Sequence, residues 1–134
     1  MDIVEIKPKI EKLAEKYGLC LILLFGSRAT GKTHVRSDFD IAYLSKIPLD
    51  LMDEARLICD LMPVFRSDKV DLVNLKKAPP LLRKQIFDRH LVLFCADKAQ
   101  YFAYQMYALR GYTEAKPLFE LRSLSIKKFL QTHA

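Results

Sequence analysis

Two aspartates and a glycine–serine pair form the clearest chemical pattern in this sequence. Gly26 and Ser27 follow the apolar run LILLF, and after ten more residues Asp38 and Asp40 open a second apolar run. Side chains alternate along a strand, so carboxylates two residues apart point to the same face. A glycine–serine turn at the end of a neighbouring strand offers small side chains and backbone N–H donors. Together these residues predict a site for a metal ion and a triphosphate.

The segment between the two apolar runs is short, basic and rich in small residues. It carries Arg28, Lys32 and Arg36. Cations beside a glycine turn suit triphosphate oxygens, although the same residues would also suit a solvated loop. The nearby aspartates favour the first interpretation, in which Gly26 and Ser27 hold phosphates and Arg28 or Lys32 neutralises their charge.

The stretch Gly26–Thr33 also fits the pattern G-x-x-x-x-G-K-[ST] of the P-loop. A P-loop requires a strand before it and a helix directly after it. Only four residues separate Thr33 from Asp38, and the chain from Asp38 alternates like a strand. A helix of normal length does not fit there, so we expect the P-loop match to be accidental.

A third carboxylate lies in a later apolar run. Asp71 stands among Val70, Leu72 and Val73, where a carboxylate buried alone would be costly. It either faces outward from an edge strand or joins the first two aspartates. Three carboxylates placed together can bind two Mg²⁺ ions, about 4 Å apart, in a site for in-line displacement at phosphorus.

The elements that position these residues follow from apolar periodicity and from proline and glycine. We expect an α/β (α+β) fold with a small mixed sheet of about four strands. The expected strands cover 19–25, 38–44, 69–75 and 91–94, the last of them at an edge, and the expected helices cover about 6–17, 49–61 and 81–89. The apolar stripe of the second helix is taken as Leu51, Ala55, Ile58 and Met62, and Pro63 is expected to end it.

The segment beyond Asp97 has a different character. Phe102, Met106 and Leu109 form a helical stripe, Gly111 interrupts it, and Pro117 is expected to start a last helix to about Leu130. Four tyrosines fall within twelve residues of this segment. Two C-terminal helices could pack on the sheet, and so much aromatic surface could equally form a partner interface.

Composition indicates a globular chain with one domain, 1–134, made of a core of about 1–96 and an extension of about 97–134. No apolar run approaches the length of a membrane span, and the charged N-terminus is unlike a signal peptide. Cys20, Cys59 and Cys95 lie among apolar residues, as expected for small core residues in the cytoplasm. Residues 76–134 carry a net charge of +7 and residues 1–75 a net charge of −1. The basic part could face nucleic acid or an acidic protein; direct nucleic-acid binding is not expected but is left open.

The pattern Gly-Ser, ten residues, Asp-x-Asp resembles the signature of the polymerase-β-like nucleotidyltransferases. Gly26, Ser27, Ala29 and Gly31 match the opening G-S-x-A-x-G, and Asp38 and Asp40 match the paired metal carboxylates. The short chain resembles the minimal nucleotidyltransferases, often encoded beside HEPN-domain proteins in toxin–antitoxin pairs. The resemblance spans about 10–94 and is strong over 26–40 and at Asp71, which matches the third acidic residue.

The resemblance implies an activity, cofactors and a partner. Such antitoxins transfer AMP from ATP to a tyrosine hydroxyl of a HEPN ribonuclease toxin and so neutralise it. It implies Asp38, Asp40 and Asp71 as catalytic residues and ligands of Mg²⁺, with ATP as substrate. Three other functions stay open: a nucleotidyltransferase with a small acceptor of the aminoglycoside type, a P-loop NTPase, and a module that neutralises a partner by binding alone.

Overall fold

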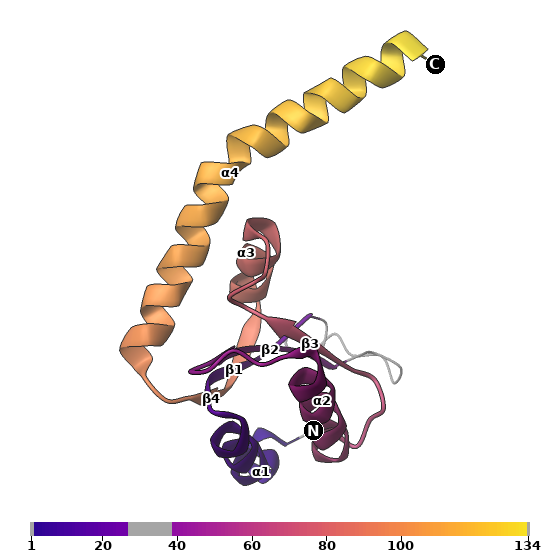
Figure 1. Ribbon diagram of the computed structural model, residues 1–134. Coiled ribbons are helices and arrows are strands. Elements are labelled where there is room, and N and C mark those ends of the chain that lie inside the picture. Colours follow the sequence, from indigo (N-terminus) through magenta and orange to yellow (C-terminus); the bar gives the residue numbers. More distant parts are fainter. Residues whose placement is uncertain (1, 27–38, 134) are drawn as a thin grey trace.

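The structure is a computed structural model that describes residues 2–26 and 39–133 (Figure 1). Its elements follow one another along the chain as helix, strand, strand, helix, strand, helix, strand and helix. Their bounds are α1 (Ile3–Tyr17), β1 (Leu19–Phe25), β2 (Phe39–Ser45), α2 (Leu51–Phe65), β3 (Val70–Asn74), α3 (Pro80–Asp88), β4 (His90–Cys95) and α4 (Lys98–His133).

The four strands form one mixed sheet in the order β3-β2-β1-β4. The central strand β1 pairs antiparallel with both β2 and β4, and β3 pairs parallel with β2. The expected α/β fold with a small mixed sheet is therefore confirmed. The strand expected at an edge is confirmed as well, because β4 forms one edge of the sheet and β3 forms the other.

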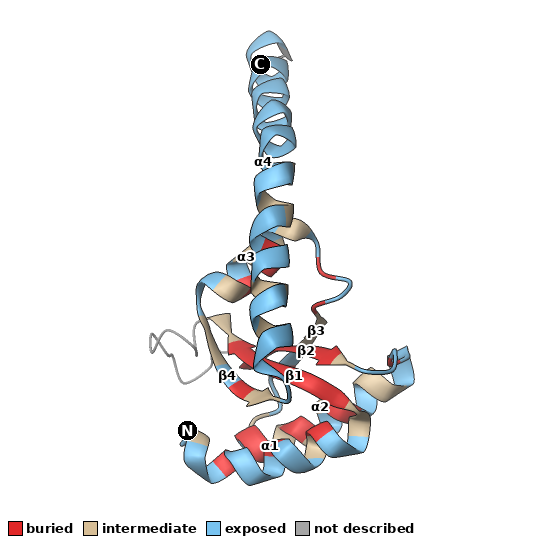
Figure 2. Ribbon diagram, turned by 90° about the vertical axis from the view of Figure 1, so that its left-hand side faces the viewer, coloured by how far each residue is buried: buried red, intermediate tan, exposed pale blue. Residues whose placement is uncertain are grey.

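Helices cover both faces of the sheet, with α1 and α2 on one side and α3 with the first part of α4 on the other (Figure 1). The strands are consequently apolar on both faces. On β2, the residues Phe39, Ile41 and Tyr43 face α1 and α2, whereas Ala42 and Leu44 face the opposite side. This is the alternation expected from the sequence, and the buried residues of the strands lie between the two helical layers (Figure 2).

The helix α2 departs from the sequence-based expectation in its face and in its end. Its first turn is fixed by a capping box between Asp50 and Asp53, and Leu51 in that turn is exposed. The fully buried stripe is Leu57, Leu61, Val64 and Phe65. Of the expected stripe, Ile58 and Met62 pack partly buried against the core, and Leu51 and Ala55 do not. Pro63 does not end the helix, because the next two residues remain in the core and Phe65 stacks on Phe39 with ring centroids 4.7 Å apart.

The C-terminal segment is one helix of 36 residues rather than the two that we expected. Gly111 and Pro117 both lie inside it. Proline removes one backbone hydrogen bond and kinks a helix without necessarily ending it, and α4 bends about halfway along its length (Figure 1). The second half projects away from the sheet and its described side chains are almost all exposed (Figure 2).

Two further sequence-based expectations concern membranes and cysteines. Within residues 2–26 and 39–133, no helix is both long and apolar enough to cross a membrane. Cys20 is buried as expected, and Cys95 is half-buried. Cys59 is exposed on α2, so its expected place in the core is wrong.

Candidate active site

Asp40 and Asp71 lie side by side at one end of the sheet. They are partners in the parallel register of β2 and β3, and neighbouring strands are about 4.8 Å apart. Val70 and Leu72 face α1 and α2, so the side chain between them faces the other side, as Asp40 does. Asp40 is half-buried and Asp71 is exposed. Two carboxylates thus share one face, at the end of the strands where water and a ligand can reach them.

Gly26 lies directly against the Asp40 carboxylate. It follows β1 with φ of +77°, a conformation that favours glycine. A Cβ atom at this position would stand 2.3 Å from Oδ2 of Asp40, far inside van der Waals contact. The absence of a side chain at Gly26 therefore makes room for the carboxylate and brings the start of the loop beside it.

A half-buried aromatic ring and a histidine lie beside Asp40 on the next two strands, so that a row of paired residues crosses the sheet from Asp71. Phe25 of β1 pairs with Asp40 on one side and with His90 of β4 on the other. The His90 ring is fixed at both nitrogens, since Nδ1 lies 3.0 Å from the carbonyl oxygen of Phe87 and Nε2 is hydrogen-bonded to the Tyr101 hydroxyl. Neither the type nor the spacing of His90 marks it in the sequence; only the register of β1 and β4 places it in the row.

The remaining predicted site residues lie outside the described part of the chain. These are Ser27, Arg28, Lys32 and Asp38, together with the stretch where a P-loop would need its helix. Within the described ranges, no group of three or more His, Cys, Asp or Glu side chains is placed to hold a metal ion. The structure thus brings together Gly26, Asp40 and Asp71, which are three of the seven predicted residues.

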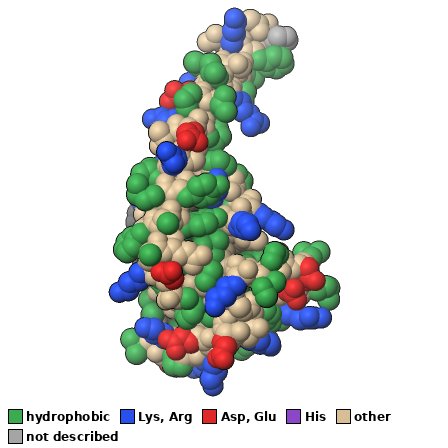
Figure 3. Space-filling model, turned by 60° about the vertical axis from the view of Figure 1, so that its left-hand side comes forward, with side chains coloured by type: hydrophobic (Ala, Val, Ile, Leu, Met, Phe, Trp, Pro, Cys, Tyr) green, Lys and Arg blue, Asp and Glu red, His purple; other side chains and the backbone are tan. Residues whose placement is uncertain are grey.

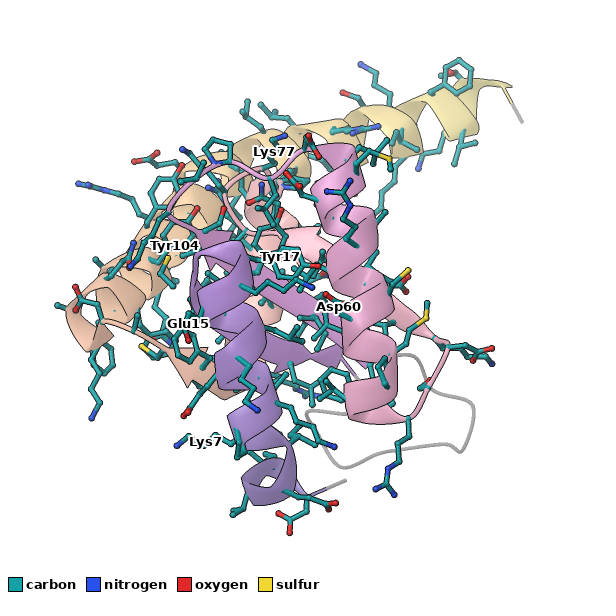
Figure 4. All side chains as sticks on the ribbon, turned by 60° about the horizontal axis from the view of Figure 1, so that its bottom comes forward. Lys7, Glu15, Tyr17, Asp60, Lys77 and Tyr104 are labelled. Atoms are coloured by element: carbon teal, nitrogen blue, oxygen red, sulfur yellow. The ribbon has the colours of Figure 1, made fainter. Side chains whose placement is uncertain are left out.

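A groove of about 570 Å³ lies between α1 and α2, on the face opposite the carboxylates. Tyr17 and Asp60 point toward one another across it (Figure 4), and the Tyr17 hydroxyl donates to the Asp60 carboxylate at 2.6 Å. Lys16 donates to the same oxygen at 2.9 Å. The bonds from Lys16 and Tyr17 lower the pKa of Asp60. These contacts show that the polar side chains of the groove link α1 to α2.

Comparison with known protein families places the carboxylates in a recognised context. A sequence model of the family described as "Polymerase beta, Nucleotidyltransferase" matches residues 8–99. This range contains Gly26, Asp40 and Asp71, and it also contains the stretch that fits the P-loop pattern.

Two curated relatives are similar in sequence, and both are named protein adenylyltransferase MntA. The protein from Aphanizomenon flos-aquae is 28% identical over 123 residues, which cover 84% of this chain and 81% of the relative. The protein from Shewanella oneidensis is 43% identical over 68 residues, which cover 51% of this chain and 48% of the relative.

Solved structures of toxin–antitoxin complexes contain chains with the same fold. A chain in a toxin–antitoxin structure with AMP-PNP superimposes with a TM-score of 0.71 at 29% identity, covering 92% of this chain and 98% of that one. A chain in the structure of the tri-AMPylated HEPN toxin of Shewanella oneidensis in complex with the MNT antitoxin gives a TM-score of 0.73 at 26% identity, covering 96% and 99%.

Proposed function

Because the chain belongs to the polymerase beta nucleotidyltransferase family, we propose that it is a protein adenylyltransferase that acts as an antitoxin. It transfers AMP from ATP to a tyrosine hydroxyl of a HEPN ribonuclease toxin and neutralises the toxin. The observation that carries this proposal is the pair of carboxylates, Asp40 and Asp71, on one face at the end of the sheet beside Gly26. The fold shared with chains solved in toxin–antitoxin complexes supports the partner.

The transfer forms one bond to phosphorus and breaks another. The tyrosine oxygen of the toxin attacks the α-phosphorus of ATP, and the bond from that phosphorus to the β-bridging oxygen breaks to release pyrophosphate. Asp71 is exposed at the end of the sheet, where it accepts the proton of the incoming hydroxyl. Gly26 and Ser27 hold the β- and γ-phosphates, and Arg28 or Lys32 neutralises their charge.

The residues at this site fit Mg²⁺. Carboxylate oxygens are the donors that Mg²⁺ prefers, together with phosphate oxygens and water. Asp40 is half-buried with a small residue against it, and Asp71 lies beside it on the next strand. We propose two Mg²⁺ ions, which Asp38, Asp40 and Asp71 would hold. Bound Mg²⁺ would neutralise negative charge on the phosphates. We also propose a cytoplasmic location, where ATP is available.

The test uses ATP labelled either at the α-phosphate or at the γ-phosphate. The protein is incubated with Mg²⁺ and with the HEPN-domain protein proposed as its partner. We expect α-label on a tyrosine of the HEPN protein, and loss of that label in Asp40→Asn and Asp71→Asn. Asp68→Asn serves as the matched control, since Asp68 is an exposed carboxylate in the turn before β3.

Three results would contradict the proposal. Transfer or release of the γ-label alone would favour a P-loop NTPase acting through Gly26–Thr33. Transfer of α-label to an aminoglycoside but not to the HEPN protein would indicate a small-molecule acceptor. Neutralisation of the toxin by Asp40→Asn without any label would show that binding alone is sufficient.

A further inference from the structure

Most of the exposed large hydrophobic side chains in the described part of the chain belong to α4. They are concentrated in its second half, residues 112–132, which we call the arm. Space-filling views show these hydrophobic side chains following α4 up to its C-terminal end, with basic side chains between them (Figure 3). The large hydrophobic residues of the arm are 37–67% exposed: Leu118, Phe119, Leu121, Leu124, Ile126, Phe129 and Leu130. Apolar surface of this extent marks an interaction site.

The hydrophobic side chains of the arm point in several directions around the helix. At 100° per residue, Leu124 and Ile126 are displaced by about 160° from one another. A surface helix typically has a single apolar stripe opposite a polar face, and the arm lacks that division. The arm is therefore built to be enclosed by something else.

The arm leaves the body at a fixed point. On α3, Arg83 is only 7% exposed, and its guanidinium lies 4.5 Å from the ring centroid of Tyr107 on α4. One turn further along, a Cβ at Gly111 would stand 3.4 Å from Nη2 of Arg83, so the small residue lets the two helices approach closely. This contact holds the first half of α4 on α3 and so fixes where the arm begins.

We propose that the arm is the docking surface for the HEPN toxin, separate from the carboxylates that carry out the transfer. This inference rests on the proposed function. The chain solved with the AMPylated HEPN toxin matches 96% of this chain, so most of α4 is part of the shared fold in that complex. The arm carries four basic and two acidic side chains. The partner surface it fits is thus an apolar groove with an acidic rim.

A second copy of this chain fits the arm less well. Two identical helices pair through one narrow stripe that repeats every 3.5 residues. The arm has no such single stripe, since its apolar side chains extend over most of its circumference. A groove formed by several helices of a partner can cover that much surface, whereas one neighbouring helix cannot.

The test compares two double variants within the arm. Leu121→Glu/Leu124→Glu places charge on exposed apolar positions, and Ser123→Glu/Ser125→Glu adds the same charge at exposed polar positions of the same turns. Both are made in the Asp40→Asn/Asp71→Asn background, so that transfer does not alter the affinity. Binding of the same HEPN-domain protein is measured by titration calorimetry. We expect the leucine pair to weaken binding at least about tenfold and the serine pair by less than about twofold.

The outcomes separate this inference from the proposed function. Equal affinity for both double variants overturns the docking surface, even if the active protein labels the toxin. Weaker binding of the leucine pair, without any label transfer by the unmodified protein, supports the docking surface and contradicts the proposed activity. Failure of the unmodified chain to bind the HEPN protein overturns both. If light scattering shows a dimer that only the leucine pair dissociates, with unchanged toxin affinity, then a second copy covers the arm.

Discussion

At Gly26 the backbone lies so close to the Asp40 carboxylate that a methyl group on the Cα atom would collide with it. The substitution Gly26→Ala would place a Cβ 2.3 Å from Oδ2 of Asp40, at a φ of +77°. We expect the carboxylate to be displaced and AMP transfer to fall at least about tenfold, because a 1 Å displacement in a catalytic site can cost about 100-fold. The measurement is the initial rate of α-label transfer at saturating ATP.

Gly18 supplies a matched control for this prediction. It also has a positive φ, +66°, but a Cβ there would meet nothing within 4 Å. Each alanine costs about 1–2 kcal/mol of stability through its left-handed backbone conformation. We expect Gly18→Ala to lower the free energy of unfolding in urea by that amount and to leave the rate of AMP transfer unchanged. If both variants lose activity equally, the proposed role of the contact between Gly26 and Asp40 is wrong.

The position of the carboxylates shows how far residue types alone can predict a site. Alternation along β2 correctly predicted which side chains share a face, because burial on both sides fixes the register of a strand. The pairing of Asp40 with Asp71 depends on the strand order, which puts β3 parallel to β2. The sequence offered two interpretations of Asp71, and the parallel register determined its neighbour. His90 was missed because its place depends on the pairing of β1 with β4.

Between elements, the hydrogen bond from Tyr17 to Asp60 joins α1 to α2 and should make stability depend on pH. Burial, followed by the bond to Asp60, raises the pKa of Tyr17 from 10.0 to about 12. The protonated hydroxyl is favoured by folding, so its contribution is complete below pH 10 and is lost as the pH rises toward about 12. We expect Tyr17→Phe to lower the free energy of unfolding by about 1 kcal/mol at pH 7, since water screens part of this bond.

The same comparison at other pH values provides the check. Unfolding in urea should show a constant difference between Tyr17→Phe and the unmodified protein from pH 7 to 9, and a shrinking one above pH 10. Asp60 acts in the opposite direction, because its lowered pKa means that its contribution is present at neutral pH and is lost in acid. A difference that persists undiminished at pH 12 would contradict the assignment.

The contact between α3 and α4 pairs a buried cation with a tyrosine ring. Tyr107→Ala would leave the Arg83 guanidinium, which is almost fully buried, without the ring 4.5 Å away. We expect a loss of about 2 kcal/mol of stability, the range for desolvated cation–π pairs. Tyr112→Ala is the control, because its ring lies 4.9 Å from the Lys84 ammonium, which water reaches. Urea unfolding should show a smaller loss there; equal losses would mean that burial of the cation does not matter.

Helices were predicted less accurately than strands, for reasons visible in α2 and α4. The sequence of α2 contains two apolar stripes, either of which could face the core. The capping box of Asp50 and Asp53 fixes where the helix starts but not which stripe is buried. In α4, Gly111 and Pro117 indicated an interruption. Gly111 instead allows close approach to Arg83, and Pro117 lies inside α4 in its exposed half, because a proline can kink a helix without ending it. Packing of Arg83 against α4 cannot be read from local sequence.

The whole molecule divides into a body that holds the sheet and an arm that makes little contact with it. Both apolar clusters of the core are built from residues that precede the arm, and on α4 they include only Tyr101 and Tyr104. Ala108 is the last residue of α4 that is fully buried. Six of the eleven basic residues in the C-terminal part, 76–134, lie on α4. The four in the arm are exposed, which the proposed docking role explains better than a role in folding.

Two truncations test this division, and they should differ sharply. Removing residues 113–134 deletes a segment whose described side chains, 113–132, are exposed or, at Ala115, half-buried, so we expect the free energy of unfolding to change by less than about 0.5 kcal/mol. Removing residues 98–134 also uncovers the face on which Tyr101, Tyr104 and Ala108 pack. At about 25 cal/mol per Å² of apolar surface, this should cost more than about 3 kcal/mol. Urea unfolding followed by circular dichroism measures both, and a shorter truncation as unstable as the longer one would show that the arm packs on the body.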